Sequence, residues 1–180
     1  MPECELGGEK HPEEFITAEL KTIAEKTAEA VMEKLKSLSF TLALAESCTA
    51  GLISALLVNT SGASENFWGS FVCYKQEAKV AMLGLNNETL AAQGIVSRET
   101  VCSMAAGVLQ KSGADITAAI TGFVGPNGDD KVRGGTIWIA VAKRDGEMFV
   151  KEFHFYGSRN TVRIRAAIAV LEEILKVLPQ

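Results

Sequence analysis

Short apolar runs alternate with longer segments whose apolar residues recur at helical spacing, and this alternation limits the folds open to the chain. The runs that we expect to form strands are residues 40–45, 67–74, 115–121, 135–141 and 148–156. The segments that we expect to form helices are residues 12–38, 49–58, 75–83, 97–113 and 159–178. Such an order predicts an α/β domain with a mostly parallel mixed sheet and one antiparallel hairpin, at Asp145-Gly146.

Capping residues sharpen these boundaries. Asn86 or Asn87 is expected to start a further helical turn that Gly94 ends. Ser97, followed closely by an acid, is expected to cap the helix that stops near Gly113.

The length of 180 residues suits one domain. Residues 1–12 combine proline, glycine and acids without an apolar period, so we expect a flexible tail followed by a single domain over residues 13–180. The formal net charge of −4 argues against a nucleic-acid partner, because such partners are held by basic surfaces.

No apolar run approaches the roughly 18 residues that cross a bilayer, so we expect no membrane partner. The acidic, polar start of the chain differs from a secretory signal. The four cysteines show no C-x-x-C spacing, which favours reduced thiols and a cytoplasmic location.

Several catalytic classes lack their motifs. The sequence contains no P-loop, no H-E-x-x-H, no EF-hand loop and no G-x-S-x-G. It has two histidines, His11 in the expected tail and His154 in an expected strand, so a Ser-His-Asp triad would have to use His154. No metal-ligand cluster is visible either, and we expect no metal or cofactor.

The polar cluster Glu46-Ser47-Cys48-Thr49-Ala50-Gly51 directly follows the first expected strand and precedes a helix. Open α/β sheets bind ligands beyond the carboxyl ends of their strands. The N–H groups at the helix start would face an anion or a developing oxyanion. The alternative is that Ser47 or Thr49 merely caps the helix.

Residues 121–128 follow another expected strand and carry three glycines, at 122, 125 and 128. Glycine lets a backbone approach a ligand closely, but the same residues also simply make a turn.

Tyr74 and Lys79 stand where a third expected strand runs into a helix. With a suitable bend both could face one cleft. The alternative is that Lys79 forms a surface ion pair with Glu77 or Glu88.

Six segments carry a resemblance to a known family. They are A-E-S-C-T-A-G at 45–51, F-V-C-Y-K-Q-E-A-K at 71–79, L-G at 83–84, G-I-V-S at 94–97, T-G-F-V-G-P-N-G at 121–128 and G-T-I-W at 135–138. In this order and spacing they resemble the CinA C-terminal-domain family, the nicotinamide mononucleotide amidohydrolases. The resemblance covers residues 40 to about 175 and is more specific than any single segment.

The resemblance implies a three-layer α/β/α sandwich and hydrolysis of nicotinamide mononucleotide to nicotinate mononucleotide and ammonia. It places the serine nucleophile on Ser47 and implies that Tyr74, Lys79 and Thr121 line the reaction centre. It also implies a substrate-holding arginine near the start of the last helix, which here is Arg159 or Arg163.

On this basis we expect Lys79, buried and neutral, to take the Ser47 proton directly or through the Tyr74 phenol. A free lysine titrates near ~10.4, so a base near neutral pH needs a pKa lowered by about 3 units.

The substrate is expected to contact three further residues, Cys48, Thr49 and Gly122. The Cys48 and Thr49 N–H groups and the Thr121 hydroxyl would hold the oxyanion. The Cys48 thiol is the adjacent alternative nucleophile.

The chain departs from the family pattern at Ala50, where glycine is usual, and at Gln76, where asparagine is common. A methyl group at position 50 could crowd the ligand. A catalytically impaired nucleotide-binding protein is therefore one alternative, and a competence- or damage-associated interaction protein is another. A homodimer is expected from the frequency of two-fold symmetry.

Overall fold

The computed structural model describes residues 12–179, with side chains from residue 16. The expected tail lies outside these residues except for Pro12, which is the first residue of a helix. The helices are α1 (Pro12–Leu38), α2 (Leu52–Leu57), α3 (Gln76–Leu83), α4 (Asn87–Gln93), α5 (Arg98–Ser112) and α6 (Arg159–Val177), with a 3₁₀ turn η1 (Ala63–Glu65). The strands are β1 (Leu42–Glu46), β2 (Phe67–Val72), β3 (Ile116–Gly122), β4 (Thr136–Lys143) and β5 (Met148–His154).

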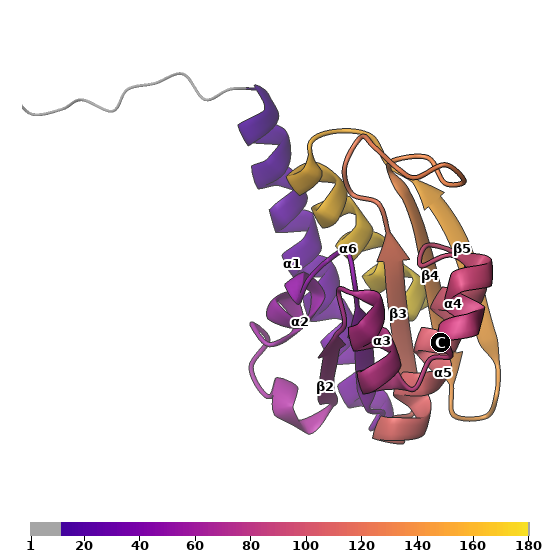
Figure 1. The fold of residues 1–180 in the computed structure, drawn as a ribbon. Helices are drawn as coiled ribbons and strands as arrows, with labels where there is room; N and C mark the ends of the chain where they lie inside the picture. Colours follow the sequence, from indigo (N-terminus) through magenta and orange to yellow (C-terminus); the bar gives the residue numbers. More distant parts are fainter. Residues whose placement is uncertain (1–11, 180) are drawn as a thin grey trace, which may run out of the picture.

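The five strands form one mixed sheet in the order β2-β1-β3-β4-β5 (Figure 1). β1 pairs in parallel with both β2 and β3, as expected for strands joined through helices. The sheet is mixed, as predicted: β1, β2, β3 and β5 run in the same direction, and β4 runs the opposite way. The prediction missed one detail, because β4 pairs antiparallel with β3 as well as with its hairpin partner β5. The segment between β3 and β4 contains no helix, so the chain returns directly alongside β3 instead of crossing over the sheet.

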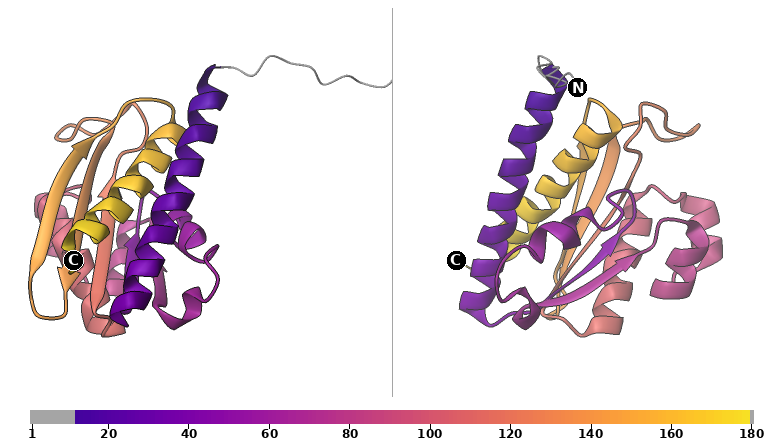
Figure 2. Two further views of the ribbon diagram at one scale, coloured as in Figure 1. Left: turned by 180° about the vertical axis from the view of Figure 1, so that it is seen from behind. Right: turned by 90° about the vertical axis from the view of Figure 1, so that its left-hand side faces the viewer.

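Helices cover both faces of this sheet, which confirms the α/β fold class. Figure 2 shows the sheet edge-on in its right panel, with α1 and α6 on one side and α3, α4 and α5 on the other. Two separate apolar cores fill these layers. None of the described helices is long and apolar enough to span a membrane.

Side chains of β1 divide between the two cores. Leu42 and Leu44 enter the core beneath α1, α2 and α6, whereas Ala43 and Ala45 enter the core beneath α5. This is the two-residue alternation of a strand, and here both faces of the strand are buried. The small alanines let α5 pack closely on the sheet.

The expected capping residues are confirmed. Asn86 Oδ1 accepts from the Glu88 N–H at 2.7 Å and Ser97 Oγ accepts from the Thr100 N–H at 3.2 Å. Gly94 and Gly113 follow the last residues of α4 and α5. Because the Ser97 cap also fixes the α4–α5 connection, it positions Ile95 and Val96 at the cavity described below.

Candidate active site

Ser47 and Lys79 meet at the carboxyl end of β1. Ser47 is the first residue after β1, and its N–H donates to the Ile120 carbonyl of β3 at 3.2 Å. Lys79 lies in the first turns of α3, which follows the neighbouring strand β2. Lys79 Nζ is 2.9 Å from Ser47 Oγ. Because β1 and β2 pair in parallel, the segments that follow them lie side by side, and Ser47 and Lys79 come into direct contact although they are far apart in the sequence.

Lys79 is buried, with only 1% of its surface exposed. Its Nζ also donates to the Cys73 carbonyl at 2.9 Å and to the Tyr74 carbonyl at 3.2 Å. It forms no ion pair with a carboxylate among residues 16–179. Burial lowers the pKa of Lys79 from its usual range. The alternative of a surface ion pair is thus wrong.

These three neighbours fit an ammonium, which would donate to all three, and they also fit an uncharged amine, which the lowered pKa favours. A neutral lysine has two hydrogens and one lone pair. The two hydrogens match the carbonyls of Cys73 and Tyr74, and the lone pair can accept the Ser47 hydroxyl proton. In this arrangement Lys79 can abstract that proton without help from the Tyr74 phenol. Tyr74 lines the cavity and is 58% exposed.

The neighbouring thiol is not activated. Burial raises the pKa of Cys48 to about 12, so the thiolate is scarce at neutral pH. Its side chain packs in the core beneath α1, α2 and α6. The raised pKa therefore disfavours Cys48 as a nucleophile at neutral pH.

The cap at the start of α2 comes from a residue that we did not single out from the sequence. Ser47 and Thr49 do not cap the helix: Ser47 Oγ contacts Lys79, and Thr49 Oγ1 is buried without a partner among residues 16–179. Instead, the buried Glu46 carboxylate accepts hydrogen bonds from the first amides of α2. The signal in the sequence was an acid at the end of an otherwise apolar strand.

A cavity of about 210 Å³ opens above Ser47. The expected residues that line it are Ser47, Cys48, Tyr74, Thr121, Gly122 and Arg159. The other lining residues belong to segments 94–97 and 121–128 of the sequence analysis but had no individual site role there: Ile95, Val96, Phe123, Val124, Gly125 and Asn127. Lys79 is not among the lining residues and approaches Ser47 from beneath the surface.

The two candidate arginines differ in position. Arg159 lines the cavity and packs close to Gly125, where an added Cβ would lie 3.1 Å from its Nη2. Arg163, one turn further along α6, donates through Nη2 to the Thr49 carbonyl at 3.3 Å and does not line the cavity. Arg159 is the one able to meet a ligand, and Arg163 supports the turn that follows Ser47.

Thr121 occupies the expected place but makes a different contact from the one expected. Its hydroxyl donates to the Ile95 carbonyl at 2.8 Å, so its proton is not free for an oxyanion. The N–H groups of Cys48 and Thr49 donate to no acceptor within the described part of the chain. Cys48 lines the cavity, whereas Thr49 is fully buried and does not line it, so of the two amides that of Cys48 is placed to meet a ligand.

His154 takes no part in this site. It lies opposite Thr136 in the β4–β5 pair, and its Nδ1 is 3.1 Å from Thr136 Oγ1. Within the described residues, no Ser-His-Asp triad forms around Ser47. Over residues 16–179 the structure holds no group of three or more His, Cys, Asp or Glu side chains that could bind a metal.

Comparisons with known proteins point in one direction. Residues 24–178 match the sequence pattern of the CinA C-terminal domain. A CinA-like protein from Thermotoga sp. (strain RQ2) is 41% identical over 86% of this chain, and the chain spans 38% of that relative's length. A nicotinamide-nucleotide amidohydrolase PncC from Enterobacter agglomerans is 37% identical over 79% of this chain and 87% of its own length. The crystal structure of a competence damage-inducible protein A from Klebsiella pneumoniae superposes with a TM-score of 0.83 at 31% identity, covering 86% of this chain and 96% of the other.

Proposed function

Because this chain belongs to the CinA C-terminal-domain family, we propose that it hydrolyses the carboxamide of nicotinamide mononucleotide to nicotinate mononucleotide and ammonia. The observation that carries this proposal is the 2.9 Å contact between Ser47 Oγ and the buried Lys79 Nζ, with no carboxylate paired to the amine among residues 16–179. The name of the amidohydrolase relative supports the choice of substrate.

The first half of the reaction transfers the acyl group to the protein. Lys79 Nζ takes the Ser47 proton as Oγ attacks the carboxamide carbon. The oxyanion that forms is held by the N–H group of Cys48, which lines the cavity and contributes roughly 3 kcal/mol to the barrier reduction. Lys79 then returns the proton to the departing nitrogen, and the C–N bond breaks to release ammonia.

The second half restores the serine. Water attacks the ester carbon while Lys79 takes one of its protons. The C–O bond to Ser47 breaks, the proton passes from Lys79 back to Oγ, and the new carboxylic acid releases its own proton to solvent, so that nicotinate mononucleotide leaves as a carboxylate. The proposed chemistry needs no metal or cofactor.

Substrate placement follows from the cavity. The carboxamide would enter toward Ser47, and the phosphate would meet Arg159, whose planar guanidinium can donate two parallel hydrogen bonds. Tyr74 and Gly122 would border the ring and ribose, and Thr121 would hold the Ile95 wall of the cavity. We further propose a cytoplasmic homodimer that acts on this small molecule and takes no nucleic-acid partner.

The departures from the family pattern do not favour a protein that binds without turnover. Ala50 is exposed and is not among the residues that line the cavity, so its methyl group does not crowd a ligand there. Gln76 donates to Asn87 Oδ1 at 3.3 Å, in an exposed contact between α3 and α4. No observation in the described residues favours an interaction role in competence or damage.

Ammonia release from nicotinamide mononucleotide tests the proposal. Wild-type protein is expected to release ammonia, and Ser47→Ala and Lys79→Met are each expected to reduce turnover by about 10³-fold or more while remaining folded. Cys48→Ala keeps its main-chain N–H and is expected to retain most of the turnover. Full activity of Ser47→Ala would contradict the serine mechanism. A wild-type melting temperature raised by the nucleotide, without ammonia, would support the binding alternative instead.

A further inference from the structure

We infer that Glu46 is a positioning residue for Ser47, holding the turn that carries the nucleophile while keeping its own negative charge on the opposite face of β1 from Lys79. The inference rests on the roles proposed above for Ser47 and Lys79. Its structural basis is one buried carboxylate with four donors.

The four contacts all come from the segment that follows Ser47. Glu46 Oε2 accepts from the N–H groups of Gly51 at 3.0 Å and Ile53 at 3.1 Å. Oε1 accepts from the Ser54 N–H at 2.9 Å and from the Ser54 hydroxyl at 2.6 Å. Residues 47–50 are thus closed into a loop between the backbone of Glu46 and its side chain.

This loop has a conformation that its sequence would not adopt by itself. Ala50 and Gly51 are both left-handed, with φ of 52° and 89°. A left-handed residue other than glycine is disfavoured by roughly 1–2 kcal/mol, so surrounding contacts must select it. The bonds from Gly51, Ile53 and Ser54 to Glu46 are placed to do so, since they fix the chain immediately after Ala50.

Strand geometry separates Glu46 from Lys79. Successive side chains of β1 point to opposite faces of the sheet, so Glu46 follows Leu42 and Leu44 toward α2, and Ser47 faces the other way. Ser47 accordingly meets Lys79 of α3. A carboxylate on the α3 face would stabilise the ammonium form of Lys79 and remove the base.

The charge of Glu46 is balanced without a cation. Glu46 is 0% exposed and takes part in no ion pair among residues 16–179. Its oxygens are instead surrounded by amides at the start of α2, whose partial positive charge favours an anion. A glutamine here keeps the shape but presents NH₂ to one set of donors, so the turn must open on that side.

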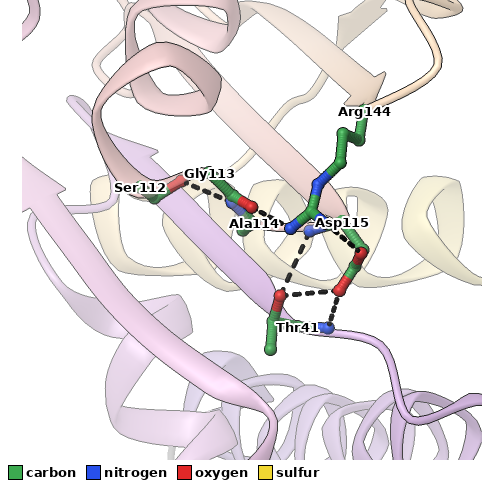
Figure 3. A network of polar contacts seen from close by, with 6 residues as sticks. All are labelled: Thr41, Ser112, Gly113, Ala114, Asp115 and Arg144. Carbon is green, nitrogen blue, oxygen red and sulfur yellow. Dashed lines mark hydrogen bonds and ion pairs between the residues drawn. The ribbon is translucent and has the colours of Figure 1, made fainter.

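Asp115 offers a matched control, because it makes the same kind of bonds at the other end of the sheet. Its Oδ2 accepts from the Thr41 N–H and the Thr41 hydroxyl, both at 2.8 Å, and Arg144 lies 3.3 Å from its other oxygen (Figure 3). Thr41 and Asp115 precede the strands whose carboxyl ends carry the cavity. Asp115→Asn therefore loses comparable bonds without touching the turn at Ser47.

The experiment compares Glu46→Gln, Glu46→Asp and Asp115→Asn by three readouts. These are thermal unfolding, kcat and KM for ammonia release, and the rate at which a fluorophosphonate labels Ser47. In labelling, Ser47 Oγ bonds to phosphorus, fluoride leaves and the hydroxyl proton passes to Lys79. We expect Glu46→Gln to lower both kcat and the labelling rate by about 10–100-fold, with KM changed less than about 3-fold. We expect Glu46→Asp to recover part of both.

Asp115→Asn is expected to unfold at a lower temperature but to keep kcat and labelling within about 2-fold of wild type. Equal losses in Glu46→Gln and Asp115→Asn would overturn the inference, because general destabilisation would then explain both. Wild-type labelling rate in Glu46→Gln would overturn it as well.

Ser54→Ala covers the case in which Glu46→Gln does not fold. It removes one of the four bonds, and it is expected to slow labelling about 2–5-fold. An unchanged rate in folded Ser54→Ala would then count against the inference. Labelling also separates the two proposals, since a wild-type protein that labels at Ser47 without releasing ammonia would contradict the substrate and leave the role of Glu46 standing. A Ser47 that never labels would overturn the role of Glu46.

Discussion

At the scale of single residues, Lys79 owes its chemical character to burial. Its amine faces two carbonyls and one hydroxyl, and within residues 16–179 it is not paired with an acid. A protonated lysine in such surroundings loses hydration without gaining a counter-charge. The burial that lowers its pKa should therefore appear in the pH dependence of stability and, under the proposed mechanism, in that of activity.

Activity should rise with pH until Lys79 has lost its proton. Because burial lowers the pKa of Lys79, kcat/KM is expected to reach its plateau below pH 10.5, the ordinary lysine value. The measurement is the pH profile of ammonia release. A rise in kcat/KM that is centred on pH 10.5, or one that persists in Lys79→Met, would contradict the proposed role of this amine.

Stability should show the matching trend. Between the lowered pKa of folded Lys79 and 10.5, the unfolded chain binds more protons, so raising the pH through this window stabilises wild type relative to Lys79→Met. Urea unfolding of both proteins from pH 7 to 10.5 measures the difference. A difference that is constant over this range would mean that folding leaves the lysine pKa unchanged.

Ala50 is expected to limit stability but not catalysis. With φ of 52° it lies in the left-handed region, and Ala50→Gly should stabilise the protein by about 0.5–1 kcal/mol with kcat unchanged within about 2-fold. Ser39, with φ of 54° after α1, offers a matched control away from the site. Urea unfolding should show a similar gain for Ser39→Gly. A destabilised Ala50→Gly would mean that the turn depends on the methyl group.

Residue roles were the least predictable part from sequence. Arg159 and Arg163 lie one helical turn apart, so spacing could not separate them, whereas the structure distinguishes them by contact with Gly125 and with Thr49. Thr121 was found at the right place, but its hydroxyl bond to the Ile95 carbonyl depends on a segment 26 residues away. Such long-range pairs leave no local pattern.

At the scale of elements, the position of Lys79 depends on how α3 packs on α5. Gly107 of α5 faces the end of α3, where an added Cβ would lie 2.5 Å from the Leu83 carbonyl oxygen. Leu83 is four residues from Lys79 on the same helix. A larger residue at 107 must therefore displace the helix that carries the base.

Gly107→Ala is expected to destabilise the protein by about 1–3 kcal/mol and to lower kcat as α3 shifts. Urea unfolding and ammonia release measure the two effects. Ala106→Ser, an exposed change one residue away, should cost about 0.5 kcal/mol or less and leave kcat unchanged. Equal kcat in Gly107→Ala and wild type would show that α3 tolerates displacement.

Element boundaries followed closely from the sequence because their signals are local. α1 begins and ends at the predicted residues, and Asn86 and Ser97 cap the helices that they were expected to cap. The start of α2 was predicted a few residues early. Its cap comes from Glu46, which is still part of β1, and sequence rules look for a cap next to the helix.

At the scale of the whole molecule, alternation of strand and helix correctly predicted an α/β fold but not the pairing of β3 with β4. A run of apolar residues fits a parallel or an antiparallel neighbour equally well when both faces are buried. The direction was set by the connection, whose glycines pack tightly enough that an added Cβ at Gly134 would lie 2.1 Å from the Pro126 carbonyl oxygen. That closeness exists only after folding, so the sequence could not reveal it.

The two-sided burial of β1 has a consequence for how such a chain can vary in length. Inserting a single residue ahead of Glu46 would exchange the faces of the two side chains that follow, sending the carboxylate toward the lysine and the hydroxyl toward α2. Glu46 and Lys79 would then form a buried salt bridge. An insertion in this strand must therefore contain an even number of residues to keep Ser47 in contact with Lys79, even where the two apolar cores would tolerate an odd number.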